Sequence, residues 1–154
     1  MKKDGQMLDK TDEEILAALR RNSRGSFREI ARGLKIHPTT LITRVAKMEK
    51  SGVILGYGAN LDLNKLGYDF MGVVQVKIAK GKLLETQEKI SRMQGVVAVY
   101  DVTGEYDSVA IIAAKTRESF SLLIKSFLNL AHVEHTNTQV ILKVVKPTWR
   151  FEAV

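Results

Sequence analysis

The sequence contains no cysteine, only two prolines and a single tryptophan in 154 residues. Without cysteine the chain has no disulfide, no thiolate nucleophile and no thiolate zinc ligand. We therefore expect an intracellular, cytoplasmic protein. No apolar run approaches the roughly 18 residues that a membrane-spanning helix needs, and no apolar segment follows the first lysines, so neither a membrane partner nor a secretory signal is expected.

The signatures of common enzymes are also missing. The sequence has no nucleophile-elbow motif, no Walker loop and no dinucleotide-binding glycine pattern. Its three histidines include His132 and His135, which are three residues apart with Glu134 between them. A metal site there is the less favoured alternative to two polar residues in a loop. We predict no catalytic residue, no metal and no cofactor.

Positive charge is concentrated in one short segment. The formal net charge is +7, and residues 15–50 hold nine lysines and arginines against two glutamates, which gives nine minus two, or +7. Such a concentration favours a polyanionic partner. An ordinary solvated helical surface would look similar, so the charge alone leaves both interpretations open.

Three short helices are predicted within residues 11–51. Thr11 with Glu14, and Ser26 with Glu29, have the spacing of capping boxes. Pro38 suits the first turn of the third helix. Only about three residues, 35–37, separate the second helix from the third, so the two must cross steeply, as in a helix-turn-helix.

The remainder of the chain has a different periodicity. An extended, strand-like connector is predicted over residues 54–63. Strands are then predicted over 70–78, 96–102, 108–114 and 138–146, with helices over 82–93 and 117–130. The order βαββαβ is that of a ferredoxin-like α+β domain. Two helices cover one face of such a sheet, and self-association is the simplest way to cover the other.

The segment Thr103-Gly104-Glu105-Tyr106-Asp107 joins two predicted strands. Its backbone amides and the Asp107 carboxylate are groups that can hold a zwitterion. A hairpin turn that uses Gly104 for positive φ is the simpler alternative. Composition alone favours the hairpin turn.

Several segments together resemble the Lrp/AsnC family, also called leucine-responsive or feast/famine regulators. The resemblance lies in Leu8-Asp9-x-x-Asp12-x-x-Ile15, Ser26-Phe27-x-Glu29-Ile30-Ala31, Thr40-Leu41-x-x-Arg44-Val45 and Glu49-x-Ser51-Gly52-Val53-Ile54. Leu66-Gly67-Tyr68 and Thr103–Asp107 match as well. The likeness extends from Leu8 to Lys146. It departs where the family has Gly in the turn and Ser at the cap of the recognition helix, because this chain has Lys35 and His37.

The resemblance implies a transcription regulator that binds double-stranded DNA, dimerises through its C-terminal sheet and often assembles to octamers. It also implies a free amino acid as effector. The effector residues implied are Asp101, Val102, Thr103, Gly104, Glu105, Tyr106, Asp107, Ser121, Lys125, Thr136, Asn137, Thr138, Gln139 and Val140. We expect an N-terminal DNA-binding domain over 1–53, a connector over 54–66 and a sensing domain over 67–154.

We expect Arg28 and Lys35 to contact DNA phosphates. The residues expected to enter the major groove are Thr39, Thr40, Thr43, Arg44 and Lys47. An equally weighted alternative pairs Arg44 with an acid on the first helix. Because Lys125 would repel a cation, we expect a neutral polar or acidic effector such as glutamine. The rival functions are a DNA-wrapping architectural protein without an effector and, last, a metabolic enzyme subunit with a fused regulatory domain.

Overall fold

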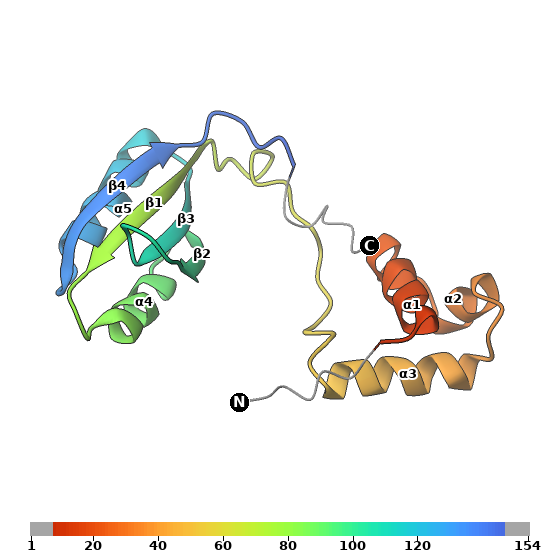
Figure 1. Cartoon of the computed structure of the whole chain (residues 1–154). Helices are drawn as coiled ribbons and strands as arrows, with labels where there is room; N and C mark the ends of the chain where they lie inside the picture. Colours follow the sequence, from red (N-terminus) through yellow and green to blue (C-terminus); the bar gives the residue numbers. More distant parts are fainter. Residues whose placement is uncertain (1–7, 147–154) are drawn as a thin grey trace. The chain divides into compact units, whose positions relative to one another are not determined.

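A computed structural model describes residues 8–146 (Figure 1). The chain divides into two compact units between Asn60 and Leu61. The boundaries expected from the sequence, after residues 53 and 66, stay a prediction. No helix among residues 8–146 has the length and apolar character needed to cross a membrane.

The first unit contains three helices: α1 (Lys10–Arg21), α2 (Phe27–Gly33) and α3 (Pro38–Lys50). They enclose a small core in which Ile15, Leu41, Val45 and Met48 are almost fully buried. The helical spacing of Leu41, Val45 and Met48 predicts that they form the inward stripe of α3, and their burial confirms it. Its opposite face is left to solvent.

The helix caps agree with the sequence in one case and differ in another. Ser26 and Glu29 form the predicted capping box of α2. The box predicted for Thr11 and Glu14 is wrong, because α1 begins earlier and uses Asp9 and Asp12. Aspartate is as good an N-cap as threonine, and tertiary contacts described below hold this pair in place.

The turn between α2 and α3 accommodates both departures from the family pattern. Lys35 has a φ of 56°, the left-handed conformation for which glycine is usual. His37 takes the N-cap position, and its Nδ1 accepts from the Thr39 N–H at 3.4 Å and lies 2.6 Å from Thr39 Oγ1. A histidine ring thus replaces the serine hydroxyl as the cap.

The segment that follows α3 differs from the expectation of an extended strand. Residues 55–62 have no regular secondary structure. Tyr57 in this segment donates a hydrogen bond to Glu49 Oε1 of α3 at 2.8 Å. A strand needs a neighbour to complete its hydrogen bonds, and this segment pairs with none in the part of the chain that is described.

The second unit is the predicted α+β domain. Its elements are β1 (Phe70–Ile78), α4 (Leu83–Ser91), β2 (Val96–Asp101), β3 (Ser108–Ala114), α5 (Arg117–Leu128) and β4 (Val133–Val140). The four strands form one antiparallel sheet in the order β2-β3-β1-β4. The ferredoxin-like fold class is confirmed.

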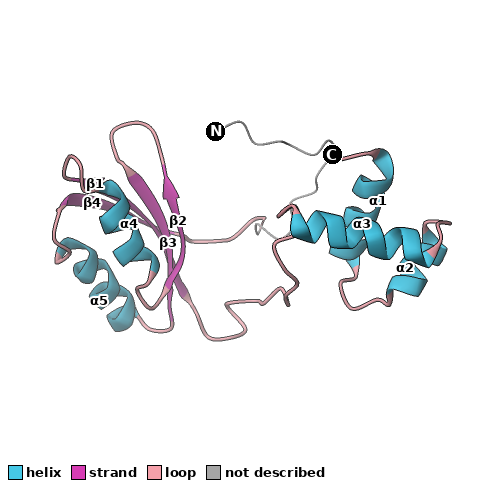
Figure 2. Ribbon diagram, turned by 90° about the horizontal axis from the view of Figure 1, so that it is seen from below, coloured by secondary structure: helices cyan, strands magenta, loops and turns pink. Residues whose placement is uncertain are grey.

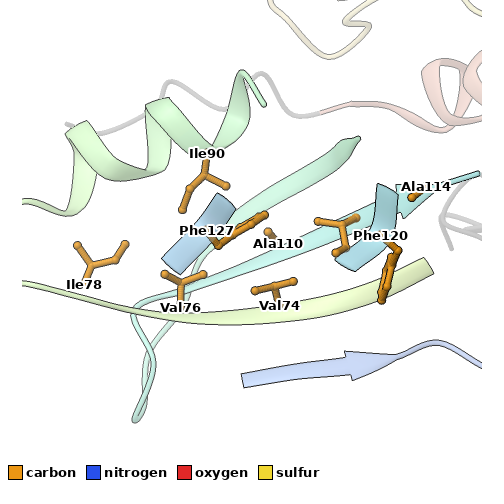
Figure 3. Packing of buried hydrophobic residues seen from close by; sticks show 9 residues of the cluster. Val74, Val76, Ile78, Ile90, Ala110, Ala114, Phe120 and Phe127 are labelled. Atoms are coloured by element: carbon orange, nitrogen blue, oxygen red, sulfur yellow. The ribbon is translucent and has the colours of Figure 1, made fainter. Parts of the chain in front are cut away.

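Both helices lie on one face of this sheet (Figure 2). Phe127 and Ile90 project from them onto Val74, Val76 and Ala110 (Figure 3). The helical spacing within residues 82–93 predicts that Leu84 points inward, but it is 80% exposed, and the fully buried residues of α4 are Thr86 and Ile90. Among residues 61–146, no helix covers the other face of the sheet.

The last strand is placed wrongly by the sequence pattern. The apolar alternation of Val140, Leu142 and Val144 predicted a strand over 138–146, but β4 runs from Val133 to Val140. Its register follows β1, with Val133 opposite Ile78 and Val140 opposite Gly72. Beyond Val140 only the Ile141 N–H still bonds to β1, donating to the Met71 carbonyl at 2.9 Å, and Leu142 is 95% exposed.

Candidate functional site

Helix α3 presents one polar, solvent-exposed face. It lines a concave surface of about 520 Å³ together with the start of α1. The lining residues are Asp9, Asp12, Thr39, Thr40, Thr43, Arg44 and Lys47. The structure thus brings together all five residues that were expected at the major groove, with two carboxylates that were not.

Arg44 differs from its neighbours on this face because it is tied to α1. Its Nη1 lies 2.6 Å from Asp9 Oδ2 and 2.8 Å from Asp12 Oδ1. The Asp12 side chain is 9% exposed, so its charge needs this partner. The alternative in which Arg44 pairs with an acid on the first helix is therefore the arrangement observed.

The same contacts make this end of α1 sensitive to acid. The hydrogen bond from Arg44 is the main cause that lowers the pKa of Asp9 below its ordinary value of 3.8, and the N–H of Asp12 adds to it. A carboxyl group with a lower pKa in the folded state stabilises the fold above its unfolded pKa. That stabilisation is lost as the pH falls through the folded pKa.

We expect Asp9→Asn to lower the melting temperature slightly at neutral pH, because asparagine keeps the cap but loses the ion pair. The change is small since the pair is exposed to solvent. The gap between the variant and the parent should narrow as the pH falls below 3.8 and close as the pH falls through the lower pKa of Asp9 in the folded state, where the parent also loses this charge. Thermal melts from pH 7 to pH 3 measure it, and a gap that stays constant would contradict the ion pair.

The residues expected at phosphates lie on other elements of the same unit. Arg28 is exposed in the first turn of α2, and Lys35 is exposed in the left-handed turn that precedes α3. Neither side chain forms a hydrogen bond or an ion pair within residues 8–146. Both are therefore available to a partner.

In the second unit, the loop between β2 and β3 is anchored through Asp107. Its Oδ2 accepts from the Ile78 N–H at 2.9 Å, and its Oδ1 lies 3.2 Å from Lys77 Nζ. The bond from Ile78 is the main cause that lowers the pKa of Asp107, and Lys77 contributes to it. Asp107 is thus a carboxylate held at the end of β1, with part of its surface open to solvent.

The neighbouring aromatic residue joins this loop to β4. The ring of Tyr106 meets the ring of His135 edge-on, with 5.5 Å between centroids. Further along β4, Asn137 donates to Gln75 Oε1 at 3.0 Å. The structure therefore brings the 101–107 loop and the 136–140 segment of β4 to the same sheet.

The remaining effector candidates are on α5. Ser121 and Lys125 are exposed there and form no hydrogen bond, ion pair or ring contact with the loop in the described chain. A single chain does not assemble all the effector candidates into one pocket. No group of three or more histidines, aspartates or glutamates within residues 8–146 has the placement to hold a metal ion.

Sequence reasoning missed several residues of these sites. Asp9 and Asp12 were included only as part of a family pattern, and Lys77 and His135 were not associated with the loop. The spacing Asp9-x-x-Asp12 is itself a capping signal and could have been recognised. The partners of Asp107 could not, because they are about 30 residues away in the sequence.

Family models match both units of the chain. Residues 8–54 match a winged helix-turn-helix DNA-binding model, and residues 71–150 match the Lrp/AsnC ligand binding domain. An uncharacterised HTH-type transcriptional regulator of Pyrococcus abyssi is 40% identical over 95% of this chain and 99% of its own. The HTH-type transcriptional regulator Ptr1 of Methanocaldococcus jannaschii is 34% identical, over 91% of this chain and 95% of its own.

Solved structures share the fold. The AsnC protein of E. coli has a TM-score of 0.84 at 24% identity, covering 92% of this chain and 96% of its own. A transcriptional regulator of Neisseria meningitidis, solved as an L-Met complex, has a TM-score of 0.82 at 24% identity, with coverages of 92% and 94%. The relatives of the present chain are transcription regulators, not enzymes. With both units matched in order along nearly its whole length, this chain belongs to the Lrp/AsnC family of DNA-binding transcription regulators.

Proposed function

We propose that this regulator reads a specific DNA sequence with α3 and that a free amino acid controls its assembly or its affinity for DNA. The observation that carries the proposal is the two-sided character of α3. Leu41, Val45 and Met48 anchor one side in the core, while threonines and Lys47 stand exposed on the other. A helix held in this way can enter the major groove without losing its packing.

The contacts with DNA divide into two kinds. Thr39, Thr40, Thr43 and Lys47 would meet base edges, and Arg28 and Lys35 would meet phosphates. Arg44 is a positioning residue in this proposal, because its ion pairs orient α3 against α1. Base contacts confer sequence preference, whereas phosphate contacts confer affinity that falls as salt rises.

The effector would bind beside the loop between β2 and β3. Asp107 is ionised and partly exposed, so it would take the ammonium group, and backbone amides near Gly104 would take the carboxylate. Ser121, Lys125 and residues 136–140 would contribute to side-chain selectivity. Since Ser121 and Lys125 form no hydrogen bond, ion pair or ring contact with the loop of their own chain, we assign that contribution to another copy.

The charge of Lys125 favours a neutral polar or acidic effector, with glutamine, asparagine or glutamate ahead of lysine and arginine. The L-Met complex of the Neisseria meningitidis regulator supports an amino acid as the class of ligand. A thermal-shift screen of the twenty amino acids tests this selection. A ligand at 100 times its Kd stabilises the folded state by about 2.7 kcal/mol, and stabilisation by lysine or arginine alone would contradict the charge argument.

The bare face of the sheet predicts self-association into a homodimer, with dimers assembling further to an octamer. Met71, Val73, Val109 and Ile111 lie on this face, opposite the residues that α4 and α5 cover. Leaving such a surface in water is unfavourable. Light scattering at micromolar concentration should show at least a dimer, and a mass equal to one chain would overturn the assignment.

A DNA-wrapping protein without an effector is the second candidate, and the positive charge of residues 15–50 favours it. Competition between specific and random DNA at several salt concentrations separates the two. A regulator should retain a sequence preference as salt rises. A wrapping protein should lose affinity for all sequences alike.

A further inference from the structure

A second concave surface lies at the end of the sheet opposite the Asp107 loop. Its volume is about 540 Å³, and its lining includes Gly95, just before β2, and Ala114, the last residue of β3. In the sheet register, Ala114 is opposite Phe70, whereas Ser108, which follows the loop, is opposite Val76. The whole length of β3 therefore separates this pocket from the proposed amino-acid site.

Three polar side chains in the lining of this pocket form no hydrogen bond within residues 8–146. Lys115 Nζ lies 5.3 Å from the centre of the Tyr68 ring, and it has no carboxylate partner within residues 8–146. The Gln94 amide and the Tyr68 hydroxyl also form no hydrogen bond there. By contrast, the hydroxyl groups of Ser119 and Ser126 are already used, donating to the carbonyls of Thr116 and Leu123.

The rest of the lining is apolar. Leu122, Leu123 and Ala114 contribute side chains, and Leu122 is 60% exposed at the surface of α5. Gly95 brings the backbone close to Leu123, since a Cβ added there would lie 2.8 Å from Leu123 Cδ2. The pocket thus combines an apolar wall with one ammonium and two neutral donors.

We propose that this pocket binds a small carboxylate with an apolar tail and no ammonium group, of the 2-oxo acid class. The carboxylate would pair with Lys115 Nζ, and the Gln94 amide or the Tyr68 hydroxyl would donate to the oxo group. The lining contains no aspartate and no glutamate. An α-amino acid would bring its ammonium beside Lys115 with nothing to balance it, so like-charge repulsion selects against it.

The volume agrees with this class of ligand. Pockets for small molecules are typically about 300–1,000 Å³ with mostly apolar walls and a few polar groups. This site does not depend on Asp107 or on the amino-acid effector. Its occupation would let the regulator respond to a deaminated carbon skeleton as well as to an amino acid.

Calorimetry on the full chain with three ligands that share one carbon skeleton tests the proposal. They are 4-methyl-2-oxopentanoate, L-leucine and 4-methylpentanamide, which differ in charge. We expect the oxo acid to bind, and Lys115→Gln to weaken it roughly tenfold, as for a hydrogen bond to a charged group. The affinity of this pocket for leucine and for the amide should be no higher than the affinity of Lys115→Gln for the oxo acid.

Two further variants keep the test independent of folding and of the other site. Leu122→Glu, at an exposed position, adds a carboxylate to the pocket lining that contains Lys115 and should weaken binding of the oxo acid by a similar factor. Lys80→Gln makes the same charge change in an exposed turn and should leave binding unchanged, as should Asp107→Ala. The proposal is overturned if the oxo acid does not bind at millimolar concentration, or if Lys115→Gln binds it as tightly as the parent does. It is also overturned if leucine binds as tightly as the oxo acid and Lys115→Gln weakens both by the same factor.

Discussion

The double substitution Thr43→Ala/Lys47→Ala is expected to lower the affinity for specific DNA by about a hundredfold. Both side chains are exposed on α3 and line the same concave surface. A good contact with a base edge contributes about 1–3 kcal/mol of discrimination, and two are removed. Gel-shift or anisotropy titrations at about 150 mM salt with specific and random DNA measure the loss.

The control for charge is Lys80→Ala, which removes one lysine from the other unit and should leave DNA affinity unchanged. Thermal melting of the double variant should match the parent, because neither side chain has a partner within residues 8–146. Arg44→Ala should behave differently and lower the melting temperature as well, since it leaves Asp9 and Asp12 unpaired. Parental DNA affinity in the double variant would show that α3 is not the reading helix.

The second large effect is expected at the loop between β2 and β3. Asp107→Ala should weaken amino-acid binding roughly tenfold to a hundredfold, the range for a hydrogen bond to a charged group. The variant removes the proposed partner of the ligand's ammonium and also leaves the Ile78 N–H without its acceptor. Calorimetry with the amino acid found in the thermal-shift screen gives the change in Kd.

Two matched variants separate charge from loop position. Asp107→Asn keeps an oxygen that can accept from the Ile78 N–H but removes the charge, so it should bind the effector about as weakly as Asp107→Ala. Glu105 is exposed, and its side chain forms no hydrogen bond or ion pair in the described residues, so Glu105→Ala should bind as the parent does. Parental binding by Asp107→Asn would show that Asp107 only positions the loop.

Local patterns in the sequence were sufficient for most helices and strands. The buried stripe of α3 and the alternation of β1 are periodicities that one element displays by itself. The positive φ at Lys35 was also foreseeable, because the family's glycine marks a turn that requires it. In each case the local structure is determined by a few residues that are close together in the sequence.

The last strand shows where that reasoning fails. Val140, Leu142 and Val144 alternate as a strand should, yet the hydrogen-bonded strand is a more polar segment that ends at Val140. Pairing with β1 decides its position, and β1 is about 60 residues earlier. An edge strand can be polar because one neighbour completes its backbone hydrogen bonds and solvent accepts its side chains.

By itself, the sequence determined the order of elements, the helix-turn-helix and the family, because these depend on periodicity, caps and short motifs. Only the tertiary structure decided which groups Arg44 and Asp107 contact. Arg44 is held by acids more than thirty positions away, and Asp107 by the end of β1. Such contacts depend on how the chain packs, and packing brings together groups whose separation in sequence carries no local signal.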